Sequence, residues 1–159
     1  MTKIEMLQMF TRGNASATEF LVMITDIAHV YDDLIDRDVP ALPEDIHRAF
    51  FNALVVLPKN QFYAQHFNLL HPLLLSAINN WRVANLLEDS EDEDALRIAF
   101  ISRSSYVDII TQTAFIIGGM AWVEEIGPVI RRFVHEEGWH NYRDSLDREK
   151  AARAAKEGD

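Results

Sequence analysis

The chain has 159 residues, 48% apolar and 25% charged, which is enough for one domain with its own core. It contains no cysteine, and this excludes a disulfide framework, a thiol nucleophile and a cysteine-ligated zinc site. The formal net charge of −10 argues against a basic face that binds nucleic acid.

The first half of the chain predicts four helices that end at glycine or proline. Ser16 and Glu19 form a capping box that starts the second helix. Pro43 opens the third helix with two acids in its first turn, and Pro58 ends it. The predicted spans are residues 1–12, 16–37, 43–57 and 61–70.

The second half predicts further helices and no strand. Pro72 breaks or kinks the chain before a helix over residues 73–87. A long helix runs from a capping box at Ser90 to residue 117 and is closed by Gly118. Shorter helices lie on either side of Gly127. The fold class is therefore all-α, with about seven to eight helices in a bundle or orthogonal packing. We expect a helical domain over residues 1–138 and a charged helical tail over 139–159.

Targeting signals are not evident in the sequence. Residues 1–10 lack the long apolar run of a signal peptide. Residues 109–123 are uncharged, but they are too short and too broken by polar residues and glycine to span a bilayer. We therefore expect a soluble, cytoplasmic protein that does not bind a membrane.

Negative charge is concentrated in two segments. Residues 26–45 contain seven acids against one arginine, and residues 88–94 contain six acids and no base. Such patches favour divalent cations or a basic protein partner.

The first acidic segment places several carboxylates on one side of the second helix. Asp32 and Asp36 lie one turn apart, as do His29 and Asp33, and Asp26 lies three residues before His29. Oxygen donors at this spacing suit Mg²⁺ or Mn²⁺. The simpler alternative is the solvated face of an amphipathic helix, although such a face usually mixes acids with lysine.

The acidic segment also resembles a known metal motif, since residues 32–36 read Asp-Asp-Leu-Ile-Asp. This resembles the DDxxD motif of class I isoprenoid synthases, in which a helix of an all-α fold binds Mg²⁺ that holds a substrate diphosphate. In size the chain is similar to all-α nucleotide pyrophosphohydrolases of the MazG type. That resemblance implies two sets of metal ligands, one from Asp32, Asp33 and Asp36 and the other from Asp108.

A broader resemblance covers residues 18–21, 26–36, 80–85 and 103–108. These stretches are similar to small helical proteins of tailed bacteriophages. The resemblance implies a location in an infected bacterial host or in a virion, and it implies no particular activity.

Three further residues could complete a site. Asp108 is flanked by apolar residues on the long helix, so it needs a partner if it is buried. That partner is a metal ion or, in the simpler interpretation, an arginine such as Arg82 or Arg103. Arginine also binds phosphate in a bidentate manner. A zinc-protease motif at residues 135–140 is excluded because its two histidines are five residues apart.

Two functional hypotheses follow from these residues. In the first, the protein holds a divalent metal and binds or hydrolyses a phosphorylated small molecule. His29 or Asp26 then orients the ligand or acts as a base, and Arg82 or Arg103 contacts the phosphate. In the second, the protein is a non-enzymatic interaction or virion-assembly protein. Its acidic face is solvated or docks a basic partner, and it forms a homo-oligomer.

Overall fold

A computed structural model describes residues 1–37 and 39–158. The described part contains helices and no strand, which confirms the predicted all-α class. The elements in chain order are α1 Lys3–Phe10, α2 Ala15–Asp36, α3 Pro43–Phe51, a π-helical turn η1 Asn52–Val56, a 3₁₀ turn η2 Leu57–Lys59, α4 Gln61–Gln65, α5 Phe67–Leu87, α6 Glu93–Ser102, α7 Tyr106–Val134 and α8 Trp139–Glu157.

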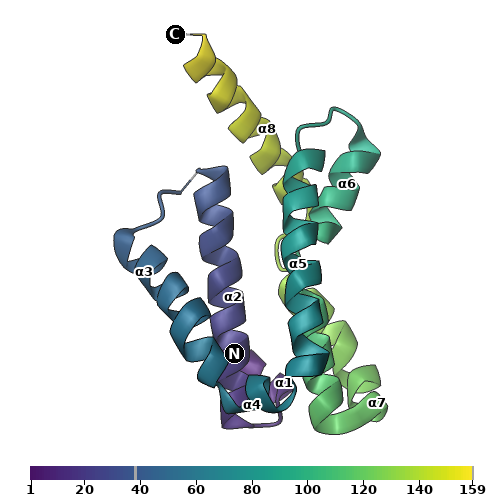
Figure 1. The fold of residues 1–159 in the computed structure, drawn as a ribbon. Helices are drawn as coiled ribbons and strands as arrows, with labels where there is room; N and C mark the ends of the chain where they lie inside the picture. Colours follow the sequence, from purple (N-terminus) through teal and green to yellow (C-terminus); the bar gives the residue numbers. More distant parts are fainter. Residues whose placement is uncertain (38, 159) are drawn as a thin grey trace.

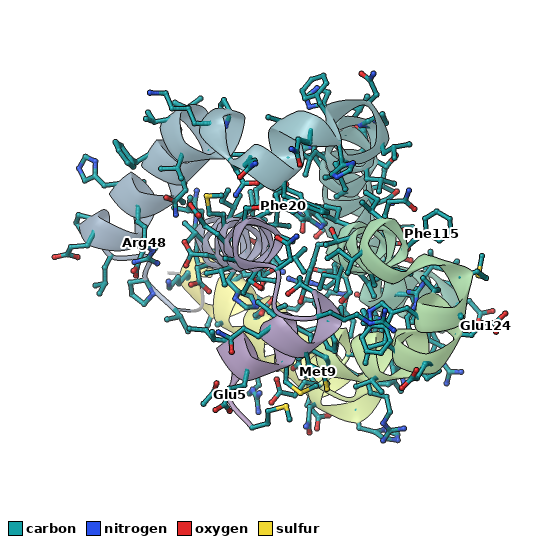
Figure 2. The ribbon with its side chains drawn as sticks, turned by 90° about the horizontal axis from the view of Figure 1, so that it is seen from below. Glu5, Met9, Phe20, Arg48, Phe115 and Glu124 are labelled. Atoms are coloured by element: carbon teal, nitrogen blue, oxygen red, sulfur yellow. The ribbon has the colours of Figure 1, made fainter. Side chains whose placement is uncertain are left out.

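Two groups of helices stand side by side. Figure 1 shows α2 and α3 on one side, α5, α6 and α7 on the other, and α1 with α4 at the lower end. Helix α2 packs against α1, α3, α4 and α7, and α5 packs against α6 and α7. Phe20 is fully buried at the centre, whereas Phe115 lies on the outer side of α7 (Figure 2). The core therefore lies between α2 and the α5–α7 group.

The start of α2 differs from the prediction. Its N-cap is Asn14, whose side chain accepts a hydrogen bond from the Ala17 amide at 3.0 Å. Gly13, with φ of 77°, turns the chain just before it. The predicted capping box at Ser16 and Glu19 is therefore wrong, because an asparagine two residues earlier already caps the helix.

The segment after α3 is more irregular than the sequence indicates. The predicted helix over residues 43–57 continues past α3 only as the turns η1 and η2. The next break falls at His66 and not at Pro72, which lies inside α5. Pro72 has no N–H to bond to the carbonyl four residues earlier, yet α5 runs through it from Phe67.

The predicted single helix over residues 90–117 is also wrong. It breaks after α6, at Arg103–Ser105, and resumes at Tyr106 as the first segment of α7, Tyr106–Val134, which is interrupted at Gly119. Ser105 explains the break: its hydroxyl donates to the Ser102 carbonyl and accepts from Asn80 of α5, at 3.0 Å. Serine hydroxyls that bond locally compete with helical hydrogen bonds.

Glycine divides α7 into two helical segments at Gly118 and Gly119, where the sequence predicts that a helix ends. Gly119 has φ of 71° and ψ of −170°, a conformation that L-residues with a Cβ rarely adopt. A Cβ on Gly118 would approach the Trp122 side chain to 2.5 Å. Trp122 needs this space because its indole nitrogen donates to the Phe10 carbonyl at 3.0 Å and so anchors α1.

The predicted charged tail is a helix, α8, and its two halves differ. Tyr142 and Leu146 are buried against Leu96 of α6, whereas residues 151–158 are exposed. Figure 1 shows the end of α8 projecting away from the other helices.

One stretch passes a composition test for a membrane span. It lies within Glu93–Glu157, and only a third of its most apolar window is buried. Core helices of soluble proteins pass the same test. Val107, Ile110 and Ala114 of α7 belong to the hydrophobic core, which is consistent with a soluble domain.

Candidate functional site

The acidic side of α2 faces two arginines from other helices. Near the middle of α2, Arg48 of α3 donates to both carboxylate oxygens of Asp26, at 3.1 Å from Nε and 2.8 Å from Nη2. Arg48 also contacts Asp45 at 2.9 Å. The hydrogen bond to Asp26, followed by that to Asp45, raises the pKa of Arg48 above its ordinary value. This ion pair is open to solvent.

The second arginine holds the C-terminal end of α2. Arg103 contacts Asp32, Asp36 at 3.0 Å and Glu88 at 2.5 Å. We call these four residues the Arg103 cluster. All except Asp32 are largely buried, with Glu88 only 7% exposed. Three carboxylates therefore share one guanidinium, which leaves an excess of negative charge in a partly buried place.

The pKa of Glu88 is shifted in this environment. Burial raises the pKa of Glu88 to about 7, and nearby carboxylates, Asp36 first among them, act in the same direction. Tyr142 of α8 opposes the shift by donating a hydrogen bond to Glu88 at 2.7 Å. Burial also raises the pKa of Tyr142, so its phenol stays protonated and remains a donor. The cluster thus joins α2, α5, α6 and α8.

These contacts bear on the predicted metal ligands. Asp32 and Asp36 both contact the guanidinium of Arg103, which stands where the sequence favours a cation. Asp108 lies exposed on α7, where it pairs at 3.5 Å with Arg131 instead of with Arg82 or Arg103. Within residues 1–37 and 39–158, no group of three or more histidine, aspartate or glutamate side chains is placed to hold a metal ion. The Mg²⁺ or Mn²⁺ site, including Asp33, stays a prediction.

A cavity of about 410 Å³ lies beside the Arg103 cluster, between α1, α2, α5, the end of α6, both ends of α7 and the start of α8. Ligand pockets in proteins span roughly 300–1,000 Å³, so its size suits a small molecule. Aromatic rings from five helices form much of its wall: Tyr31, Trp81, Phe100, Tyr106, Phe133 and Tyr142. We call this cavity the aromatic pocket.

Two polar atoms at the aromatic pocket lack a partner. In the described part of the chain, Trp81 Nε1 and His135 Nδ1 are the buried side-chain nitrogens without a hydrogen bond. Both residues line the pocket, and Trp81 is 8% exposed. A buried donor without a partner costs about 1–3 kcal/mol, so such groups are rare in structures and call for an explanation. A hydrogen-bond acceptor on a bound molecule would provide the missing partner of Trp81 Nε1.

The titratable groups of the aromatic pocket have shifted pKa values. Desolvation lowers the pKa of His29, and Lys3 adds to the effect, against the opposing influence of Asp33 and Asp26. Desolvation likewise lowers the pKa of His135. Both imidazoles are therefore neutral at pH 7 and offer one donor and one acceptor each.

The charges around the aromatic pocket are unequal. Four carboxylates line it, from Asp26, Asp32, Glu136 and Glu137, against two cations, Lys3 and Arg103. Arg48 engages Asp26, and Arg103 engages Asp32. The groups left over are the cation of Lys3 and two glutamates, so the pocket retains a net negative field.

The predicted site residues separate into two sets. His29, Asp26, Asp32 and Arg103 line the aromatic pocket. The others do not line it: Asp33, Asp36, Arg82 and Asp108. Arg82 is exposed on α5, one turn from Asn85, which does line the pocket and donates to the Tyr31 hydroxyl at 3.3 Å.

Most residues of the pocket wall cannot be predicted from the sequence. Trp81 is buried, and no local pattern predicts that its N–H lacks a partner. His135 was considered only as part of a zinc motif. Aromatic residues at helical spacing look alike whether they fill a core or line a cavity, so no local signal distinguishes Tyr106 or Phe133.

Comparison with known proteins adds no assignment to this geometry, since no family model, no curated protein and no solved structure matches the chain.

Proposed function

We propose that this protein binds a small organic cation, an aromatic ring that carries a protonated amine, in the aromatic pocket. The observation that carries the proposal is the buried, unpartnered indole N–H of Trp81 in the wall of a cavity of about 410 Å³. A ligand with a hydrogen-bond acceptor would satisfy this donor, and the six aromatic rings would bury its apolar part.

The charge of the ligand follows from the lining. Aromatic faces attract cations, and Glu136 and Glu137 add negative charge that no arginine neutralises among the contacts described above. The neutral imidazole of His135 can accept a hydrogen bond from a protonated amine. These features support a cation and disfavour the phosphorylated ligand expected from the sequence, because Arg103 is already shared by three carboxylates.

A catalytic role for His29 and Asp26 stays a prediction. His29 lines the aromatic pocket as a neutral imidazole, which is the form a general base requires. Asp26 accepts two hydrogen bonds from Arg48, so its carboxylate is already engaged. Binding alone therefore accounts for the arrangement with fewer assumptions than catalysis.

The test uses aryl-alkyl amines against acids of the same shape. Tyramine and dopamine, whose hydroxyl oxygens are hydrogen-bond acceptors, should raise the melting temperature in a dose-dependent way, because a ligand that binds only the native state stabilises it. Their matched acids, 4-hydroxyphenylacetate and 3,4-dihydroxyphenylacetate, should not. Equal shifts from amines and acids, or no shift from any of them at millimolar concentration, would contradict the proposal.

A pair of tryptophan variants locates the binding. Trp81→Phe keeps a ring in the wall but removes the N–H, so we expect tyramine to bind about five- to tenfold more weakly, as the loss of one hydrogen bond implies. Trp139→Phe is the control, because Trp139 packs on Phe100 outside the pocket lining. Calorimetric titration of both variants measures the difference.

A further inference from the structure

Helix α5 has an outer face that is as apolar as its inner face. The inner face, with Leu70, Ala77 and Ala84, is buried in the domain. Along all of Phe67–Leu87, the only side chain that is fully ionised at pH 7 is that of Arg82. A helix that is apolar all round is normally buried, whereas a solvated face carries many charges. Figure 1 shows α5 at the front of the molecule with no helix over its near side.

Four of the six large apolar residues exposed on α5 lie in one stripe, and the other two, Phe67 and Leu69, lie at the start of the helix outside it. Leu75, Ile78, Val83 and Leu86 are 61%, 54%, 50% and 58% exposed. At 100° per residue they share an arc of about 140° with Arg82, opposite the buried face. We call these five residues the α5 stripe. Monomeric proteins seldom leave such contiguous apolar surface in water.

The order of the four apolar residues in the α5 stripe is symmetric about its midpoint, between Asn80 and Trp81. Leu75 and Leu86 are equidistant from this point, as are Ile78 and Val83. An antiparallel copy of the same helix would therefore place leucine against leucine and isoleucine against valine. Such self-complementarity is what a twofold interface requires.

We propose that the protein forms a homodimer through the α5 stripe, with the two α5 helices antiparallel about a twofold axis near residues 80 and 81. The single charge fits this arrangement. In the dimer Arg82 lies opposite Asn79 of the partner subunit, so its guanidinium meets an amide oxygen. No carboxylate on α5 would be buried, because the helix has none.

The α5 stripe offers a small interface, and small interfaces are typical of weak association. A standard interface covers about 800 Å² of each partner. The α5 stripe is short, about 16 Å from Leu75 to Leu86 at 1.5 Å per residue. Helix α6, which packs on α5, adds exposed Ile98 and Ile101 to the apolar surface of this group. We therefore expect a dimer that dissociates in the micromolar range.

Sedimentation velocity between 1 and 200 µM tests the oligomeric state. We expect a monomer–dimer transition for the wild type and a monomer throughout for Ile78→Glu. Leu54→Glu is the matched control, since Leu54 is 71% exposed on η1 and lies outside the stripe. Circular dichroism verifies that both variants fold. A wild-type protein that stays monomeric at 200 µM would overturn the proposal. This includes the case in which it binds neutral phosphatidylcholine vesicles, because the α5 stripe would then face lipid and not a second copy.

Cross-linking tests the antiparallel register. Because the chain has no natural cysteine, a disulfide can form only between the introduced thiols. Leu75→Cys and Leu86→Cys proteins, mixed and oxidised, should form a disulfide-linked heterodimer. Each protein alone should not, because like positions would be about 16 Å apart along the axis. Cross-linking of each variant with itself and none in the mixture would overturn the register.

Discussion

The two arginine sites on α2 use the same chemistry in different surroundings. Arg48 holds Asp26 in a bidentate pair that is open to solvent. Arg103 holds Asp32, Asp36 and Glu88 in a place that is largely closed. Exposed ion pairs contribute little to stability, whereas breaking a buried one leaves charges without solvent or partner. Both arginines join helices, and burial separates the pair that contributes little to stability from the one whose loss is costly.

The largest effect should come from removing Arg103. Arg103→Ala leaves the three carboxylates of the cluster facing one another, and the loss of a buried ionic partner typically costs about 3–5 kcal/mol. Urea unfolding followed by circular dichroism measures it. A loss below about 1 kcal/mol would show that the Arg103 cluster behaves like a surface pair, and the contrast with Arg48 would disappear.

The pH dependence of stability should reveal Glu88. Its pKa in the folded state, about 7, lies above the value near 4.5 of an unperturbed glutamate. The native state therefore binds the proton more tightly than the unfolded chain, and stability falls as pH rises from about 5 to 8. The expected decrease is about 3 kcal/mol.

Glu88→Gln is the control for this interpretation. It removes the ionisation while keeping a carbonyl oxygen that accepts from Tyr142. In the variant, we expect the free energy of unfolding to fall much less between pH 5 and pH 8. At pH 8 the variant should be at least as stable as the wild type. An unchanged pH profile in the variant would assign the titration to another group.

A smaller loss is expected for Tyr142→Phe. The change deletes the hydroxyl that donates to Glu88 at 2.7 Å and leaves the ring that packs on Phe100. Hydrogen bonds to charged groups contribute about 1.5–3 kcal/mol. The loss should increase above pH 7, where Glu88 is ionised, and thermal unfolding at pH 5.5 and pH 8 would show it. A pH-independent loss would mean that the hydroxyl serves a different partner.

The exposed site should show the smallest mutational effect. Arg48→Ala removes contacts with Asp26 and Asp45, but water and salt already screen these charges. We expect a melting temperature close to that of the wild type, and much less change than for Arg103→Ala. Thermal unfolding in low and high salt measures the melting temperature. A destabilisation equal to that of Arg103→Ala would show that the two arginine sites do not differ.

Divalent metal offers a last check on the acidic helix. If Arg103 serves as the cation for Asp32 and Asp36, millimolar Mg²⁺ or Mn²⁺ should not change the melting temperature relative to EDTA. A rise that Asp33→Ala or Asp36→Ala abolishes would instead support the metal site predicted from the sequence.

The sequence predicts the fold class better than it predicts the site. Helical spacing and the absence of strand signals are local, so the all-α class follows from them. The break at Ser105 depends on Asn80 of another helix, and the choice of Asn14 over Ser16 as a cap depends on how the chain turns at Gly13. Such tertiary influences are not encoded in local spacing.

For the same reason, only part of the candidate site can be predicted from the sequence. The cluster of aspartates on α2 shows that a cation is needed there, and the sequence contains that signal. Which cation supplies it depends on a contact between Asp36 and Arg103, 67 residues apart. Likewise, the aromatic pocket arises where helices fail to fill the space between them, and only the packed structure shows this.

The most direct test of the central claim is the indole region of a ¹H–¹⁵N correlation spectrum during titration with tyramine. The chain has three tryptophans, and Trp122 is an internal control because its N–H already bonds to the Phe10 carbonyl. We predict that the Trp81 indole signal moves with saturable dependence on tyramine while the Trp122 signal stays in place. A Trp81 signal that does not move, or that moves equally with 4-hydroxyphenylacetate, would contradict the assignment of the aromatic pocket as a site for organic cations.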